Sequence, residues 1–178
     1  MKCSFKVPIK IAGAKLKDKS KLMESQSGGA FTAIAEWFLE QGAVVYGCGM
    51  DTDLNVIYKR ITCIEDLHLI KGSKYVQAQL GNTFQCVKDD LNSGKVVLFS
   101  GTPCYVHAVQ RFTDSNINRE NLYTIDLICH GVPSPLIYKT YLRELERKKK
   151  GRIRLFIFRD KRGGWNRHME RVIYDDGS

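Results

Sequence analysis

Two apolar runs, each followed by a turn rich in glycine and proline, most constrain what this chain can fold into. Residues 95–100 (KVVLFS) lead through GTPC into the helical pattern of 105–112. Residues 122–129 (LYTIDLIC) lead through HGVPS into the helical pattern of 135–150. Short apolar runs of this kind are typical of buried strands, whereas the longer segments have helical spacing. Two successive strand–helix units predict a parallel sheet.

The other segments predict helices and antiparallel strands around that core. Ser27 is the expected N-cap of a helix and Gly42 its C-terminal stop. The predicted fold class is α/β, a mixed sheet with a parallel βαβ core, helices on both faces and antiparallel strands at the ends. In chain order we expect a strand at 9–16, a polar linker at 17–26, a helix at 27–42, a two-stranded hairpin within 43–62, helices at 63–72 and 83–93, and final strands at 152–160 and 168–178.

The length of 178 residues suits one domain, so 1–178 is expected to be a single domain with a loose N-terminal segment at 1–8. The chain ends on IYDDGS, where Asp-Gly would normally open a hairpin, so the domain is expected to be incomplete at its C-terminus. No apolar run approaches the ~18 residues of a membrane span. The N-terminus also lacks the apolar segment of a secretory signal, so a cytoplasmic protein is expected.

The net charge of +9 raises the question of an anionic partner. The basic residues lack the aromatic alternation of a groove for single-stranded nucleic acid. The run RKKK also suits the C-terminal end of a helix, where cations are favoured. Nucleic-acid binding is therefore not expected, and an acidic protein partner or an anionic cofactor is the preferred explanation of the charge.

Cys104 and Cys129 end the two core units at the sheet edge where α/β proteins hold their chemistry. The N–H groups of a following helix stabilise a thiolate, so a nucleophile, a redox thiol and a cluster ligand all remain open for Cys104. A cysteine phosphatase is excluded, because six residues rather than five separate Cys104 from Arg111. A hydrolase that uses His107 or His130 stays open, as does simple packing of both thiols.

The remaining cysteines are expected to be reduced, because disulfides are rare in the cytoplasm. Three of them fall within apolar or helical patterns, and one lies in the N-terminal segment: Cys48, Cys63, Cys86 and Cys3.

A candidate anion site lies at SQSGGAF, where two glycines open a helix and leave its N–H groups approachable. Lys74, in the segment KGSKY, offers a cation for an anionic or electron-rich ring. Each signal is weak alone, because Ser-Gly also starts ordinary helices and a loop lysine is commonly a surface residue.

Five motifs, taken together and in order, resemble the coenzyme F420 (deazaflavin) hydrogenase/dehydrogenase β-subunit family: SQSGGAFTAIAEWFLEQGAVVYG, KGSKYVQA, VVLFSGTPC, DLICHGVPSP and FRDKRGGW. The members of this family are iron–sulfur flavoproteins. The matches extend from Lys10 to Trp165. The resemblance implies FAD and an iron–sulfur cluster that pass electrons between a reduced carrier, of deazaflavin or ferredoxin type, and a partner protein such as a hydrogenase or dehydrogenase subunit.

The resemblance also implies roles for individual residues. By position, the cofactor-binding residues are Ser27, Gly28, Gly29 and Lys74 at the flavin and Gly101 and Thr102 in the loop of Cys104, and the cluster ligands are Cys104 and Cys129. Longer members carry further cysteines before and after these motifs, so the cluster is expected to be incomplete in this chain and oxidoreductase activity belongs to the intact parent. Two alternatives stay open: a thiol-dependent hydrolase or transferase using Cys104, and a truncated, non-catalytic binding module.

Overall fold

The computed structural model describes residues 8–115, 118–164, 167 and 169–178. Its main sheet has the strand order β2–β1–β3–β4. β1 pairs with β3, and β3 with β4, in parallel, whereas β2 is antiparallel to β1. The predicted parallel core and the predicted hairpin are therefore confirmed. The strands span Val44–Met50 (β1), Val56–Ile61 (β2), Val97–Gly101 (β3) and Leu122–Asp126 (β4).

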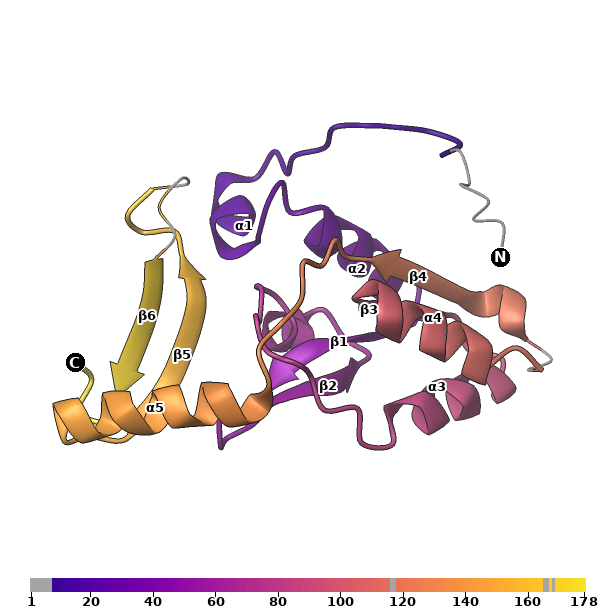
Figure 1. Cartoon of the computed structure of the whole chain (residues 1–178). Coiled ribbons are helices and arrows are strands. Elements are labelled where there is room, and N and C mark those ends of the chain that lie inside the picture. The colour runs from indigo at the N-terminus through magenta and orange to yellow at the C-terminus, as the bar shows by residue number, and fades with distance from the viewer. Residues whose placement is uncertain (1–7, 116–117, 165–166, 168) are drawn as a thin grey trace.

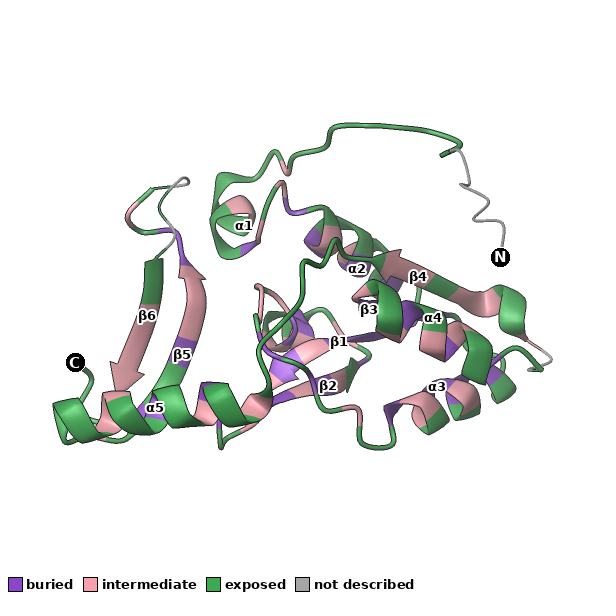
Figure 2. Cartoon of the chain, in the orientation of Figure 1, coloured by how far each residue is buried: buried purple, intermediate pink, exposed green. Residues whose placement is uncertain are grey.

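Helices cover both faces of this sheet, as predicted (Figure 1). Side chains alternate along each strand, so Tyr46 and Phe99 lie in a core with α3 and α4, while Val45 and Leu98 pack against α2. Figure 2 shows the buried residues gathered at the main sheet and its helices. The helices span Ala30–Glu40 (α2), Thr83–Asn92 (α3) and Pro103–Phe112 (α4).

The final strands β5 (Ile153–Asp160) and β6 (Met169–Tyr174) are antiparallel, as predicted, and form a separate sheet. Helix α5 (Pro135–Lys149) has 15 residues and is roughly 22 Å long, and it leads the chain to β5 beside the main sheet (Figure 1). The two parts share one hydrophobic core, in which Phe156 contacts Tyr138 with ring centroids 5.6 Å apart. Among the described residues, no helix is both long and apolar enough to cross a membrane.

The N-terminal third departs most from the predictions. Residues 9–16 form no strand; Ile9 and Ile11 are exposed, and no described strand pairs with them. The short helix α1 (Lys19–Glu24) lies where a polar linker was expected. Helix α2 is capped by Gly29 and not by Ser27, because the turn that closes from Gln26 O to Gly29 N delays the first helical residue. Residues 1–7, most of the segment expected to be loose, lie outside the described part.

Two smaller elements complete the chain. The helix expected at 63–72 is a short 3-10 helix, η1 (Glu65–Leu69), and a second one, η2 (Arg119–Asn121), precedes β4. Because β4 ends at Asp126, Cys129 lies three residues beyond the strand, in the connection to α5.

Candidate functional site

The glycine turn, residues 27–29, is built by close backbone approaches. A Cβ on Gly28 would lie 2.1 Å from the carbonyl oxygen of Ala14, and the carbonyl of Gly28 accepts a hydrogen bond from Leu16 N at 2.8 Å. Gly29 has φ +79° and a Cβ there would meet the side chain of Leu16. Ser27 is exposed and has a positive φ of 48°. These contacts explain why glycine is required, and they hold the first turn of α2 without a side-chain cap.

The end of β5 and the residue after it hold this turn from the other side. The ammonium of Lys161 donates to the carbonyls of Leu22 and Ser25, and its side chain is only 6% exposed. Gln26 Nε2 donates to the carbonyl of Arg159 at 3.2 Å. Since Lys and Arg side chains near a helix C-terminus satisfy its last carbonyls, Lys161 fixes the end of α1 and the start of the glycine turn together.

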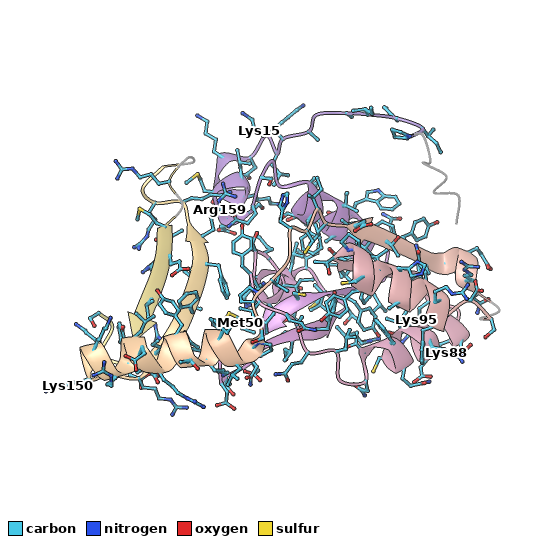
Figure 3. The ribbon with its side chains drawn as sticks, viewed as in Figure 1. Lys15, Met50, Lys88, Lys95, Lys150 and Arg159 are labelled. Atoms are coloured by element: carbon cyan, nitrogen blue, oxygen red, sulfur yellow. The ribbon has the colours of Figure 1, made fainter. Side chains whose placement is uncertain are left out.

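A pocket of about 330 Å³, named the β5 pocket below, lies between Gln26, which precedes the glycine turn, the loop after η1, and β5. Arg159 and Met50, two of its lining residues, are labelled in Figure 3. The lining mixes cationic groups with apolar and aromatic ones, which suits a planar ring carrying negative charge. Its cationic side chains are Lys59, Lys71, Lys74 and Arg159, and its apolar ones include Met50, Leu69, Leu155, Phe156 and Phe158.

Lys74 lies in the wall of the β5 pocket. Its ammonium donates to the carbonyls of Cys48 at 2.8 Å and of Lys71 at 2.7 Å. Burial lowers the pKa of Lys74 to about 8, because desolvation penalises the charged form. An ammonium has three donors, so the third N–H of Lys74 is available to a ligand.

Two buried polar atoms at the β5 pocket have no hydrogen-bond partner among the described residues: Oε1 of Gln26 and Nε of Arg159. Buried polar groups are nearly always paired, so orphaned ones at a pocket indicate a missing partner. Sequence reasoning did not single out either residue. Gln26 lies in the motif SQSGGAF and Arg159 in FRDKRGGW, but the contact between them joins positions 133 apart in the chain.

Cys104 and Cys129 lie at matching positions beyond two neighbouring strands. Gly101 and Asp126 are register partners in β3 and β4, and each cysteine follows three residues later. Both thiols are exposed and reduced. The Sγ of Cys104 lies 3.2 Å from Oγ1 of Thr102, the N-cap of α4, and the Sγ of Cys129 accepts from Gly131 N at 3.3 Å.

Tyr58 connects the surroundings of Lys74 with those of Cys104. A Cβ on Gly101 would lie 2.4 Å from the Tyr58 hydroxyl, and the Tyr58 ring stacks on Phe99 with centroids 5.0 Å apart. Burial, together with the neighbouring Cys48 thiol, raises the pKa of Tyr58 above its usual range. Tyr58 lies on the buried face of β2, and its hydroxyl approaches Gly101 in the loop of Cys104.

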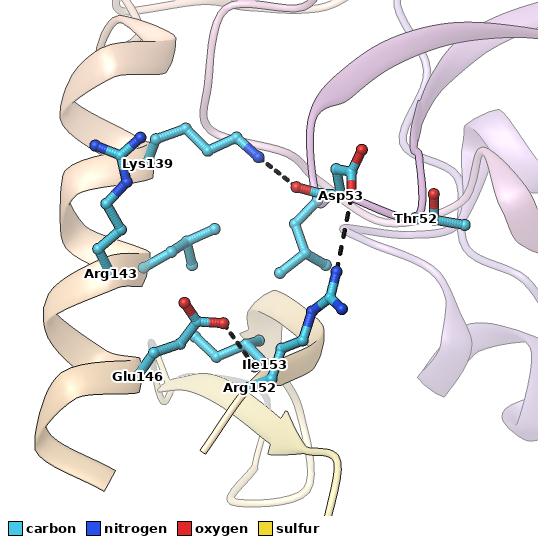
Figure 4. A pocket seen from close by; sticks show the side chains of 9 residues that line it. Thr52, Asp53, Lys139, Arg143, Glu146, Arg152 and Ile153 are labelled. Atoms are coloured by element: carbon cyan, nitrogen blue, oxygen red, sulfur yellow. Dashed lines mark hydrogen bonds and ion pairs between the residues drawn. The ribbon is translucent and has the colours of Figure 1, made fainter. Parts of the chain in front are cut away.

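A second cavity, of about 350 Å³, lies between the β1–β2 turn and α5, away from all of these residues. Figure 4 shows Lys139 reaching the carbonyl of Asp53 and Arg152 facing its carboxylate, at 3.9 Å. Both acidic side chains of the lining are engaged, since Glu146 accepts from Ile153 N at 2.8 Å. The polar contacts across this cavity connect the β1–β2 turn with α5 and the start of β5, and they have a structural role.

Comparison with known proteins then identifies the family. Family models of the coenzyme F420 hydrogenase/dehydrogenase beta subunit match residues 11–84, for its N-terminal part, and residues 94–175, for its C-terminal part. The chain belongs to this family. The glycine turn and Lys74 lie in the first match, and both strand-end cysteines and Arg159 lie in the second.

A solved structure of the F420-reducing [NiFe] hydrogenase complex from Methanosarcina barkeri contains a chain of similar fold. The TM-score is 0.64 at 18% identity, with 92% of this chain and 56% of that chain covered. The F420 beta-subunit-like chain therefore spans little more than half of the length of that relative. No curated protein gives a significant match.

The residues present fit one of the two cofactors that the family implies. The β5 pocket, with its cations, aromatic walls and orphaned atoms, fits the ring of a flavin. Its volume lies at the lower end of the roughly 300–1,000 Å³ of ligand pockets, which suits the ring rather than the whole dinucleotide. A cluster fits less well, because within the described residues no group of three or more His, Cys, Asp or Glu side chains could hold a metal. Cys104 and Cys129 alone do not complete a four-thiolate set.

Proposed function

We propose that this chain is the flavin-binding part of an electron-transfer oxidoreductase of the F420 beta-subunit type. The β5 pocket carries the proposal, because a flavin-sized space with cationic and aromatic walls lies where the family's glycine and lysine motifs meet. We further propose that electrons pass between a reduced carrier, of deazaflavin or ferredoxin type, and a partner protein or subunit.

The side chains and backbone of the pocket define what this chain contributes. Bound FAD supplies two-electron hydride chemistry together with one-electron transfer, while the protein positions and tunes it. Lys74 places a positive charge beside the ring and favours its negatively charged forms. The glycine turn packs against Ala14 and Leu16 and so fixes the chain next to Gln26, which lines the pocket. Phe156 and Phe158 exclude water from one wall.

Gly101, Thr102, Cys104 and Cys129 belong to the electron-exit side in this proposal. The two thiols lie beyond adjacent strands and are exposed, so they are available as two ligands of an iron–sulfur cluster. The other ligands must come from outside the described residues. No described hydrogen bond joins Cys104 to a histidine, so nothing in the geometry favours the thiol-dependent hydrolase.

A titration with FAD tests the proposal. The purified chain should quench flavin fluorescence with saturation. Lys74→Met should weaken binding about tenfold, the cost of one charge-assisted hydrogen bond. Lys148→Met, on the exposed face of α5, is the matched control and should bind as the wild type does. The proposal is contradicted if the wild-type chain shows no saturable FAD binding, or if both lysine variants behave alike.

A further inference from the structure

We infer that Gln26 and Arg159 together recognise the edge of a cyclic imide, an N–H group next to a carbonyl, in the ligand of the β5 pocket. This inference rests on the proposed function and names the part of the ligand that the pocket selects. It comes from the two orphaned atoms, Gln26 Oε1 and Arg159 Nε, which belong to neighbouring side chains of the lining.

The two atoms are chemically complementary. Gln26 Nε2 donates to the backbone carbonyl of Arg159, which fixes the amide orientation and leaves Oε1 as a pure acceptor. Arg159 Nε carries a hydrogen and can only donate. An acceptor and a donor on two side chains that line one pocket and contact each other suit a ligand that offers a donor and an acceptor side by side.

This requirement narrows the class of ligand. An inorganic phosphate is excluded as the partner of both atoms, because a phosphate ion offers little donor capacity to Gln26 Oε1. The pyrimidinedione edge of a flavin fits, with its N3–H between two carbonyls, and a 5-deazaflavin carries the same edge. The amino edge of adenine also pairs a donor with an acceptor, but the carbonyl-rich imide better suits a lining that contains Lys59, Lys71 and Lys74.

The inference includes a small rotation of the two side chains. Solvent does not reach either atom in the present conformation, so both side chains must turn enough to admit the ligand edge while Gln26 Nε2 keeps its bond to the Arg159 carbonyl. The backbone around Gln26 need not move in this rotation. Lys161 holds the carbonyls of Leu22 and Ser25, and Ser25 Oγ lies 2.7 Å from Thr32 Oγ1 in a buried hydrogen bond.

A residue-and-ligand cycle tests the inference. Dissociation constants are measured for FMN and for N3-methyl-FMN, with the wild type, Gln26→Leu and the control Gln85→Leu, whose glutamine lies exposed on α3. N3-methylation should weaken binding to the wild type and to the control about tenfold, the value of one hydrogen bond. Gln26→Leu should weaken FMN binding by a similar factor and should no longer distinguish the two ligands.

The same measurements identify the opposing results. Equal binding of both ligands to the wild type overturns the inference, and this comparison does not depend on whether Gln26→Leu folds. If N3-methylation still weakens binding to Gln26→Leu, the inference is also overturned. FAD is measured in addition. If Gln26→Leu weakens the binding of FAD but not of FMN, the adenine and not the flavin ring lies at this edge, and the inference is wrong. A repeat with a 5-deazaflavin separates the two proposals: N3-dependent binding of the deazaflavin without any flavin binding supports the inference and contradicts the FAD proposal, whereas no binding of either ring contradicts both.

Discussion

Lys74 shows how a single side chain links the fold to the proposed chemistry. It ties β1 to the loop after η1 through the carbonyls of Cys48 and Lys71, and it faces the β5 pocket. Because burial lowers its pKa from 10.5 to about 8, the charge of Lys74 changes within an experimentally accessible pH range. The free energy of folding that is lost by burying the charged ammonium is fully lost below pH 8. This loss decreases as the pH rises from about 8 toward 10.5, the pKa of the unfolded chain.

FAD affinity should therefore depend on pH through Lys74. The affinity should be constant below pH 8 and should fall as the pH rises above about 8, where the free chain loses the Lys74 charge. Lys74→Arg should bind FAD without this fall, because a guanidinium stays charged. Flavin fluorescence titrations from neutral to alkaline pH provide the measurement. An identical alkaline fall in both proteins would assign it to another group.

The glycine turn gives a second prediction for one residue. Gly28→Ala should lower the free energy of unfolding by about 2 kcal/mol, in the range of an overpacked substitution, because the new Cβ meets the backbone of Ala14. Gly13→Ala, in the same N-terminal segment, has no atom within 4 Å of its new Cβ and should be nearly neutral. Urea denaturation of both variants measures the difference. Equal stabilities would show that the approach of Gly28 to Ala14 is not maintained in solution.

At the scale of elements, Asp90 connects helix α3 to strands β1 and β2. Its carboxylate lies on α3 and accepts hydrogen bonds from Tyr46 on β1 at 2.6 Å and from Arg60 on β2 at 2.8 and 3.0 Å, with Lys95 adding a third partner. Burial by itself raises the pKa of Asp90, but these hydrogen bonds outweigh it and hold the pKa well below 3.8. The aspartate thus fixes α3 against the hairpin edge of the sheet.

Asp90→Asn should lower the free energy of unfolding at neutral pH by about 2 kcal/mol, the value of hydrogen bonds to a charged group with partly exposed partners. Because the folded pKa is depressed, this stabilisation is present above pH 3.8 and is lost as the pH falls below it. Urea unfolding at neutral pH and at about pH 3 should therefore show a smaller acid loss in Asp90→Asn than in the wild type. The neighbouring, exposed Asp89→Asn is the control. An unchanged acid loss would mean that other carboxylates dominate.

The whole molecule shows which features a sequence can and cannot predict. The parallel core followed from apolar runs with clear turns, such as Val97–Gly101, because burial on both faces leaves a local pattern. The strand expected at 9–16 was wrong, since alternating residues form a strand only where a neighbour offers hydrogen bonds. The glycines of the motif predicted a turn before α2. The helix nevertheless starts two residues later than predicted, because its N-cap is Gly29 and not Ser27.

The site was predictable only in part, for a related reason. Lys74, and the glycine motif through its residue Gln26, fell on one wall of the β5 pocket, and the strand-end pattern drew attention to Cys104 and Cys129. The opposite wall comes from β5, and the contact between Gln26 and Arg159 spans 133 positions. Such pairs arise from how α5 places the second sheet, and no local pattern records that placement. No local pattern identifies the proposed partner protein either, and the match to the similar solved chain covers only 56% of that chain.

The most direct test of the central claim is an absorbance spectrum of the chain after anaerobic incubation with FAD and removal of the unbound cofactor. The account predicts flavin bands near ~375 and ~450 nm that stay with the protein. These bands should bleach on stepwise reduction with dithionite and return on reoxidation. A colourless protein after removal of free FAD would contradict the assignment of the β5 pocket and, with it, the proposed electron-transfer function.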